Sequence, residues 1–375
     1  MIVTQFFNLL YAGLLGKPAN SGLFLHWDIE KWQTLYRFAQ EQTVTAIIWD
    51  GIMSLPENLY PPKTLWYQWL GNVLKIEKSN EYLNTILPEI LERAAGAGIR
   101  MEDGVMPITL LKGQGTAAVY PNPLHRSPGD VDIYAGNGYK LLEKNLPKMG
   151  FKRIGHSTKH AEYEYKGIIV ENHRYTALFF CPWLAWRLKK LVVEWFPEEL
   201  TVRKIGTEEI LVAPPWFEAL FGVIHFRTHL HLEGVGWRQL CDWWLLKQRL
   251  TSEDNKLQTE YARYEKGLHK LKLIRIETLM EELFSILVLQ NKNLGDLSPT
   301  TLEVYKEMMS GGNFGHYAKD AHNHSFAYQT GFWKGAYNLA LHDIRRSKKF
   351  FSLFPEEVLF SPLFRIGGYL KRKGK

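Results

Sequence analysis

The periodicity of the apolar residues changes twice along this 375-residue chain, and these changes constrain its fold more than any other feature. In residues 1–98, apolar side chains recur every three or four positions, as on one face of an α-helix. Residues 106–174 instead carry short runs typical of β-strands, such as ITLLK, VDIYA and IIVENHR. From residue 211 the helical spacing returns. The pattern predicts an α+β or α/β fold, with a small mixed sheet embedded between helical regions.

The changes in pattern divide the chain into three predicted segments. Residues 1–100 form a helical N-terminal region, residues 101–210 form the core that carries the strands, and residues 211–375 form a helical C-terminal domain with a basic tail. Pro214 and Pro215 suit the start of the first C-terminal helix, because proline is favoured in the first helical turn.

Local signals refine this division. Within the core, GYKLLEKNLPKMG predicts a helix closed by Gly150, and Lys166–Gly167 lies where a hairpin turn would join AEYEY to IIVEN. Farther on, residues 255–289 predict one long helix in which Gly267 is the weak point. Residues 291–325 carry several glycines and little periodicity, which predicts a loop.

The composition favours a globular protein of the reducing cytoplasm. Apolar residues make up 46% of the chain and aromatic residues 14%, enough for one large or two ordinary hydrophobic cores. Cys181 and Cys241 lack the spacing of a disulfide framework or a zinc site. The run FFNLLYAGLL has no preceding basic region, and no segment reaches the ~18 apolar residues of a membrane span. We therefore expect a cytoplasmic protein that does not use a membrane.

The net charge of +7 does not by itself identify a partner, because 46 basic residues are opposed by 39 acidic ones. The excess is partly local, since IRRSKKFF and YLKRKGK concentrate cations near the C-terminus. A solvated basic surface is the first interpretation of this tail. Binding to nucleic acid or to another anion is the alternative.

The most informative short motif is GDVDIY. Asp130 and Asp132 are two positions apart on a predicted strand, so both carboxylates project from the same face. The intervening Val131 and the following Ile133 point to the opposite, buried face. Two carboxylates held close together favour a hard divalent cation that also contacts substrate phosphates. The alternative is an exposed acidic strand that begins after the Pro128–Gly129 turn.

A glycine turn precedes this strand. The segment ITLLKGQG reads as a strand followed by glycines, and the helix-compatible TAAVY comes next. Such a turn presents free backbone N–H groups to an anion. A lone Gly-x-Gly would be weak evidence. The order strand, glycine turn, short helix, Arg126 and alternating DVDI strand is a joint pattern that chance reproduces far less often.

This order resembles the DNA polymerase β-like nucleotidyltransferase superfamily, in which a strand ending in two small residues precedes an Asp-hydrophobic-Asp strand. More narrowly, LLKG, YPNP, Arg126 and GDVDIY are similar to a bacterial family of uncharacterised nucleotidyltransferases with the pattern LLKG, Y, P, R, DIDLL. The resemblance covers residues 108–133 well and extends less closely to residue 174. It implies transfer of a nucleoside monophosphate from an NTP to a hydroxyl, with Mg²⁺ or Mn²⁺ as the metal.

The resemblance also implies which residues hold the metal. Asp130 and Asp132 match the two aspartates of the superfamily, and the third carboxylate matches Glu171 in IIVENHR. In the narrower family an acidic residue is followed two positions later by histidine, which here is His173 on the same strand face. Glu162 and Glu164 in AEYEY compete with Glu171 for this role.

For the phosphates, the resemblance implies the turn Lys112, Gly113, Gln114 and Gly115, together with Arg126. Gln114 stands where the superfamily has a second small residue, and Gly115–Thr116 is the alternative source of the glycine pair. Lys112 either contacts phosphate or simply ends the strand. Arg126 either clamps a phosphate bidentately or pairs with an acidic neighbour.

Residues of the C-terminal domain are candidates for the acceptor side of the site. His225 and His229 in VIHFRTHLHL are four apart on a predicted helix, a spacing that can bind a transition metal. No HExxH motif accompanies them, so packed histidines or an acceptor-binding surface are the favoured interpretations. The helix WRQLCDWWLL resembles a helix of the narrower family, so Arg238 and Asp242 are expected to face the site. An intrahelical pair is the simpler explanation.

Three functions remain open from the sequence. The leading hypothesis is an Mg²⁺-dependent nucleotidyltransferase whose acceptor is a small molecule, a protein or a nucleic acid. The second is a catalytically inactive nucleotide- or partner-binding module of the same fold. The third is an RNA-binding protein that uses the basic tail, which predicts affinity that falls with salt and needs no Mg²⁺.

Overall fold

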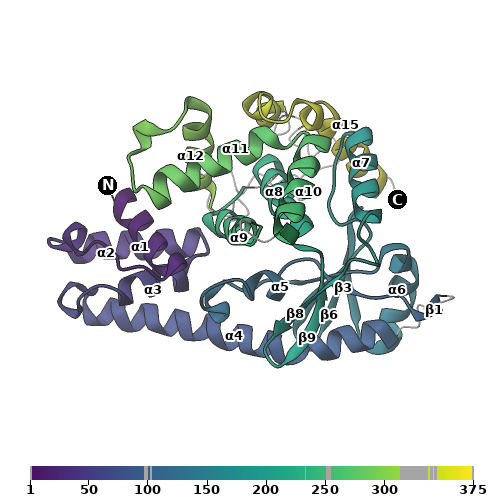
Figure 1. The fold of residues 1–375 in the computed structure, drawn as a ribbon, viewed down its shortest axis with the longest axis horizontal. Helices are drawn as coiled ribbons and strands as arrows, with labels where there is room; N and C mark the ends of the chain where they lie inside the picture. The colour runs from purple at the N-terminus through teal and green to yellow at the C-terminus, as the bar shows by residue number, and fades with distance from the viewer. Residues whose placement is uncertain are drawn as a thin grey trace.

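A mixed sheet of seven strands lies between a long helix, α4, and the helices of the C-terminal half (Figure 1). The computed structural model describes residues 2–96, 100–101, 104–232, 234–250, 255–312, 337, 341 and 344–373. The architecture is α+β, so the expectation of a small mixed sheet between helical regions is confirmed.

The strand order is β5-β6-β7-β4-β3-β9-β8. β4 pairs in parallel with β7, and β3 pairs in parallel with β9, whereas the other neighbours are antiparallel. A separate two-stranded ribbon is formed by β1 and β2. The strands are β1 (Arg100–Met101), β2 (Gly104–Val105), β3 (Thr109–Leu110), β4 (Val131–Tyr134), β5 (Lys152–His156), β6 (His160–Tyr165), β7 (Ile168–His173), β8 (Thr201–Ile205) and β9 (Glu208–Val212).

The helices fall into an N-terminal group, a pair of short helices within the core and a C-terminal group. They are α1 (Val3–Leu15), α2 (Ile29–Glu41), α3 (Thr45–Met53), α4 (Lys63–Gly96), α5 (Gln114–Ala117), α6 (Tyr139–Asn145), α7 (Pro182–Val193), α8 (Pro215–Leu232), α9 (Trp237–Gln248), α10 (Asn255–Lys270), α11 (Ile274–Leu283), α12 (Pro299–Gly311) and α15 (Pro355–Lys373). α8 begins at Pro215, as the proline pair predicts.

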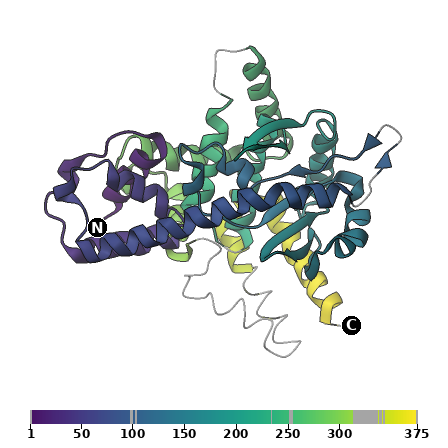
Figure 2. The same cartoon turned by 90° about the horizontal axis from the view of Figure 1, so that it is seen from below.

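Two hydrophobic clusters hold the fold together. We call them the helical core, formed mainly by the N- and C-terminal helices, and the sheet core, formed by one face of the sheet. α4 contributes to both: Leu65 and Trp69 are buried in the helical core, and Leu87 and Ile90 in the sheet core. Seen from below, α4 passes first beneath the N-terminal helices and then beneath the sheet (Figure 2).

The two faces of β4 have different surroundings. Val131 and Ile133 belong to the sheet core, as the alternation in the sequence predicts. Tyr134 belongs to the helical core on the opposite face, and burial raises the pKa of its hydroxyl to about 12. Asp132 lies on this second face and is fully buried. The face of the sheet that carries the aspartates is therefore the one covered by the C-terminal helices.

The turn predictions within the core are confirmed. Gly150 ends the α6 region with φ of 92°. Lys166 and Gly167 join β6 to β7 with φ of 48° and 78°, both in the left-handed region that a two-residue hairpin turn requires. The sequence pattern did not reveal the β8–β9 hairpin, whose second strand extends the sheet beside β3.

Two predictions in the C-terminal half are wrong. The long helix expected over residues 255–289 is broken near Lys272, which has φ of 55°, rather than at Gly267. Gly267 lies inside α10, where a Cβ would be 2.6 Å from Leu220 Cδ2, so its small size permits close packing on α8. The loop expected over residues 291–325 contains α12, whose N-cap Ser298 accepts a hydrogen bond from Thr301 N. Residues 313–325 of that expected loop lie outside the described residues.

The first basic stretch, IRRSKKFF, is partly used inside the fold. Arg346 donates to the backbone carbonyls of Leu230 and His231, and both Arg346 and Lys349 pair with Glu307 of α12. These two cations are therefore engaged internally, which weakens the case for an RNA-binding tail. The side chains of YLKRKGK lie outside the described residues. Within the described part of the chain, no helix is long and apolar enough to cross a membrane.

Candidate functional site

Three carboxylates meet where β4 and β7 run side by side. The parallel register places Asp132 directly opposite Glu171, and Asp130 immediately precedes β4. One oxygen from each of the three residues lies within 4.8 Å of the others. The tertiary structure thus brings together the two aspartates and the glutamate that the sequence suggested as metal ligands.

Neither of the competing glutamates joins this group. Glu162 lies on β6, with its Oε1 atom 3.2 Å from His160 Nε2. Glu164 is half-buried, and its Oε2 atom lies 4.0 Å from Lys152 Nζ. Within the described residues, Glu171 is the glutamate that shares a possible ligand cluster with Asp130 and Asp132.

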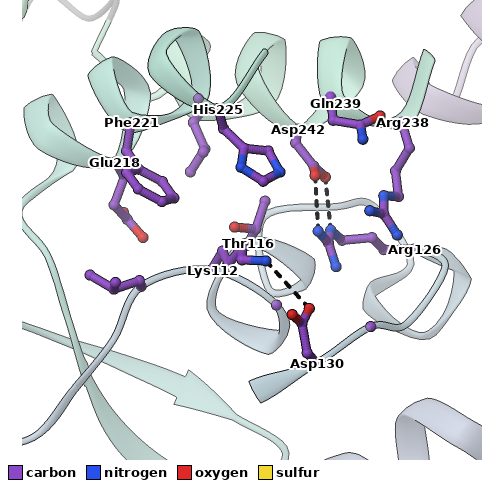
Figure 3. Close-up of a pocket in the computed structure, with 15 residues that line it drawn as sticks. Lys112, Thr116, Arg126, Asp130, Glu218, Phe221, His225, Arg238, Gln239 and Asp242 are labelled. Atoms are coloured by element: carbon purple, nitrogen blue, oxygen red, sulfur yellow. Dashed lines mark hydrogen bonds and ion pairs between the residues drawn. The ribbon is translucent and has the colours of Figure 1, made fainter. Parts of the chain in front are cut away.

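Lys112 sits between the two aspartates. Its Nζ atom is 3.3 Å from Asp130 Oδ1 and 3.1 Å from Asp132 Oδ2 (Figure 3 shows the contact with Asp130). Burial disfavours the charged amine, but the nearby carboxylates of Asp132, Asp130 and Glu171 outweigh it and raise the pKa of Lys112. Lys112 is therefore a firmly protonated cation that neutralises the acidic group.

The glycine turn after Lys112 lies tightly against the aspartate strand. Gly113 has φ of 68°, and a Cβ there would be 3.2 Å from the carbonyl oxygen of Asp130. Gln114 is buried and donates to Asn84 Oδ1 of α4 at 2.6 Å. A Cβ on Gly115 would be 3.2 Å from Val212 Cγ1 of β9. Gly113 therefore faces the site, while Gln114 and Gly115 mainly fix the turn to its neighbours.

A pocket opens between this turn and helices α8 and α9 (Figure 3). Among the described residues, Lys112, Gly113 and Arg126 line it from the core side, but Gln114 and Gly115 do not. Its other lining residues are Leu111, Thr116, Gly129, Asp130, Glu218, Phe221, Gly222, His225, Arg238, Gln239, Asp242 and Leu246.

Arg126 is held at the mouth of the pocket by Asp242 of α9. Its Nε and NH2 atoms donate to the two carboxylate oxygens at 2.8 and 2.9 Å, a bidentate pair (Figure 3). Tyr120 Oη also donates to Asp242 Oδ1, at 2.6 Å. Burial opposes ionisation of Asp242, but Arg126 outweighs it and lowers the pKa of the carboxyl group. Asp242 therefore pairs with Arg126 across the pocket and not with a residue of its own helix.

Arg238 adds a second guanidinium to the same wall. It donates to the carbonyl oxygen of Ser127 at 3.3 Å. Burial and the charge of Arg126 lower its pKa, which means that the cationic form is less well compensated than in water. An anion bound in the pocket would relieve this crowding of positive charge.

The C-terminal histidines divide between the pocket and the core. His225 lines the pocket, and its pKa lies well below the usual value because of burial and the proximity of His229. The rings of His225 and His229 are 4.2 Å apart between centroids. His231 packs between Phe180 and Phe354. Neither His225 nor His229 belongs to a cluster of three possible metal ligands in the described part of the chain, which fits packed histidines.

Two site residues escaped the sequence analysis. His160 on β6 lies opposite His173 in the antiparallel register, and its Nδ1 atom is 2.9 Å from Glu171 Oε2. Lys159 precedes it in the chain, and partial burial together with the charge of Lys112 lowers the pKa of its amine. The signal available in the sequence was KHAEYEY, in which His160, Glu162 and Glu164 alternate on one strand face.

The geometry places three carboxylates that could hold a metal ion beside a pocket that contains cationic side chains. Three clustered carboxylates supply the oxygen ligands that Mg²⁺ prefers, so the residues fit this ion. Beside them, Lys112, Arg126 and Arg238 supply positive charge and N–H donors suited to phosphate oxygens. An Mg²⁺-bound polyphosphate combines both requirements.

Comparison with known proteins agrees with this chemistry. No curated protein and no solved structure shows a significant match to the chain. A family model described as "Uncharacterised nucleotidyltransferase" matches residues 28–275, which is more than half of the chain and includes the carboxylates, the glycine turn and helices α8 and α9. The chain therefore belongs to this family of uncharacterised nucleotidyltransferases.

Proposed function

We propose that this protein transfers a nucleoside monophosphate from an NTP to a hydroxyl group of an acceptor, using Mg²⁺ held by Asp130, Asp132 and Glu171. The observation that carries the proposal is the register of β4 and β7, which clusters the three carboxylates at the edge of a pocket lined by Lys112, Arg126 and Arg238. Membership of a nucleotidyltransferase family supports the reaction class.

In this reaction the acceptor oxygen forms a bond to the α-phosphorus, the bond from that phosphorus to the bridging oxygen breaks, and pyrophosphate leaves. The hydroxyl proton passes to water. Mg²⁺, when bound, supplies charge neutralisation for the triphosphate and for the attacking oxygen. We assign Glu171 to holding the ion rather than to accepting the proton, because the imidazoles of His160 and His173 overcome the effect of burial and lower its pKa.

The cationic residues bind and orient the triphosphate. Arg238 and Arg126 present guanidinium groups toward the pocket, and Arg238 is the less compensated of the two. Lys112 neutralises Asp130 and Asp132, and with a divalent ion bound to these carboxylates it would be free to contact a phosphate oxygen. We assign the acceptor to the wall formed by α8 and α9, where His225, Phe221 and Gln239 line the pocket.

The test is calorimetric titration of each of the four NTPs, with and without Mg²⁺, into the wild type and an Asp130→Ala, Asp132→Ala double variant. We expect Mg²⁺-dependent binding that weakens at least about 100-fold in the variant, a loss of about 3 kcal/mol. Equal binding by the two proteins would contradict the metal assignment. Absence of Mg²⁺-dependent NTP binding in the wild type would contradict the proposed reaction.

A matched pair of glutamate variants tests the third ligand. Glu171→Gln should weaken Mg²⁺-NTP binding by about 10-fold or more, since it removes one negative charge next to the ion. Glu164→Gln, on the adjacent strand β6 and outside the carboxylate cluster, is the control and should bind like the wild type. If Glu164→Gln weakens binding and Glu171→Gln does not, the choice between these glutamates is wrong.

A further inference from the structure

Each of the two histidines beside the carboxylates has one ring nitrogen near Glu171, which we call the inner nitrogen. The other, outer nitrogen lies near a hydrogen-bond acceptor. His173 Nδ1 lies 3.2 Å from the carbonyl oxygen of Tyr175, and His160 Nε2 lies 3.2 Å from Glu162 Oε1. A carbonyl and an ionised carboxylate only accept hydrogen bonds, so each of these nitrogens can donate to its neighbour in one of the two tautomers. In a neutral imidazole the second nitrogen then has a free lone pair.

The inner nitrogens converge on the same carboxylate. His173 Nε2 is 3.0 Å from Glu171 Oε2 and 2.7 Å from Asp132 Oδ1, and His160 Nδ1 is 2.9 Å from Glu171 Oε2. Despite this short distance, His160 Nδ1 is a buried atom without a hydrogen-bond partner of acceptable geometry among the described residues. In the tautomer that the outer acceptors support, the lone pairs of both inner nitrogens and of Glu171 would be available to one bound cation.

The acceptors beside the outer nitrogens match the usual surroundings of metal-binding histidines. Histidines that bind metals usually donate their other ring N–H to a carbonyl or carboxylate, which fixes the ring orientation. His173 has a backbone carbonyl as this acceptor, and His160 has a carboxylate.

We propose that His160, Glu171 and His173 bind a divalent first-row metal ion such as Zn²⁺. Their ligand atoms lie within 4.8 Å of one another. Two imidazoles and one carboxylate suit Zn²⁺, whereas Mg²⁺ prefers oxygen ligands only. The site goes beyond the proposed nucleotidyl transfer, because it requires no nucleotide, although it shares Glu171 with the all-oxygen group.

The experiment titrates metal-freed full-length protein with Zn²⁺ by calorimetry and with Co²⁺ by visible absorption, in the absence of nucleotide. We expect one equivalent to bind, with ligand-field bands for Co²⁺ that Zn²⁺ abolishes. His160→Ala should weaken binding by about 10- to 100-fold or more and reduce these bands. His156→Ala is the matched control, because this exposed histidine on the neighbouring strand β5 lies outside the cluster.

Asp130→Asn separates this inference from the proposed function. Asp130 belongs to the all-oxygen group but not to the histidine group, so its variant should keep Zn²⁺ binding and lose Mg²⁺-NTP binding. Failure of the wild type to bind one equivalent of Zn²⁺ or Co²⁺ would overturn the inference. Equal affinity of the wild type and His160→Ala would also overturn it, whatever the outcome of the NTP titrations.

Discussion

Lys112 stands at the boundary between the acidic and the basic halves of the site. It contacts both aspartates, and their charges raise its pKa in spite of burial. Asp132 is fully buried, so removal of the lysine would leave a carboxylate without compensation in a region of low polarity. The residue therefore serves as an internal counter-ion whose role a divalent cation can replace.

We predict that Lys112→Met lowers the free energy of unfolding by about 3 kcal/mol in the presence of EDTA, because it leaves the buried carboxylate of Asp132 without a counter-ion. Saturating Mg²⁺ should recover much of this loss, since an ion at 100 times its Kd stabilises the folded state by about 2.7 kcal/mol. Urea unfolding with and without Mg²⁺ measures both effects. Lys140→Met, on the exposed surface of α6, is the control.

Mg²⁺ should not raise the unfolding free energy of the control, Lys140→Met, in the same way. If it does, Mg²⁺ acts on the surface charge in general and not on the aspartate pair. If Lys112→Met is as stable as the wild type in EDTA, Asp130 and Asp132 do not depend on Lys112 for compensation.

At the scale of elements, the pair Arg126–Asp242 joins the core to helix α9. Arg126 follows the 3₁₀ turn Pro123–His125, and Asn80 of α4 holds this segment by donating to the carbonyl oxygens of Leu124 and Arg126. The two charged side chains are 5% and 14% exposed, so the pair is largely removed from water. Both walls of the pocket are thereby fixed relative to each other.

We predict that Asp242→Asn destabilises the protein by about 3–5 kcal/mol at pH 7, because it leaves Arg126 buried without its counter-ion. The folded-state pKa of Asp242 is lowered, so its stabilising effect is complete above the unfolded value of about 3.9 and is lost as the pH falls toward the folded value. Denaturant unfolding at pH 7 and near pH 3 should show the difference between wild type and variant shrinking at the lower pH.

A double variant separates loss of the pair from loss of one charge. Arg126→Met, Asp242→Leu should be more stable than Asp242→Asn, because it leaves no unpaired buried charge. A double variant that is less stable than the single variant would show that other contacts of Arg126 dominate. A difference that does not change with pH would show that Asp242 is not ionised in the folded protein.

At the scale of the whole molecule, α4 contributes buried residues to both the helical core and the sheet core. Its first half packs into the helical core and its second half into the sheet core. A continuous helix transmits loss of packing at one end to the other, since its backbone hydrogen bonds form cooperatively. The sheet that carries the carboxylates and the helices that line the pocket are therefore expected to unfold together.

We predict that Leu87→Ala, in the sheet core, lowers the unfolding free energy by about 2–5 kcal/mol. Tryptophan fluorescence reports on the helical core, which buries residues such as Trp69 and Trp195, while the sheet core buries no tryptophan among the described residues. The fluorescence transition should nevertheless shift as far as the transition followed by circular dichroism. Leu74→Ala, exposed on the same helix, is the control and should change stability by less than about 0.5 kcal/mol.

A fluorescence transition that stays in place while the circular dichroism transition moves would show two independently unfolding units. In that case α4 would not couple the cores, and the pocket would lie between parts that can separate. A large effect of Leu74→Ala would instead indicate that helix stability, and not core packing, limits the transition.

Much of the fold could be predicted from the sequence, because strand alternation, helical spacing and turn residues are local signals. The strands β4 to β7, the turn at Lys166–Gly167 and the start of α8 follow from such patterns. The break at Lys272 and helix α12 could not be predicted in this way. A left-handed residue other than glycine and a glycine-rich helix end are selected by packing against neighbours that are distant in the sequence.

The sequence by itself determined that Asp130 and Asp132 share a strand face and that a glycine turn precedes them, since both depend on neighbours along the chain. Only the tertiary structure decided which glutamate joins them, because the register of β4 and β7 selects Glu171. It also decided that Asp242, 116 residues away, is the partner of Arg126. Pairing across a sheet or a pocket depends on distances that no local pattern encodes.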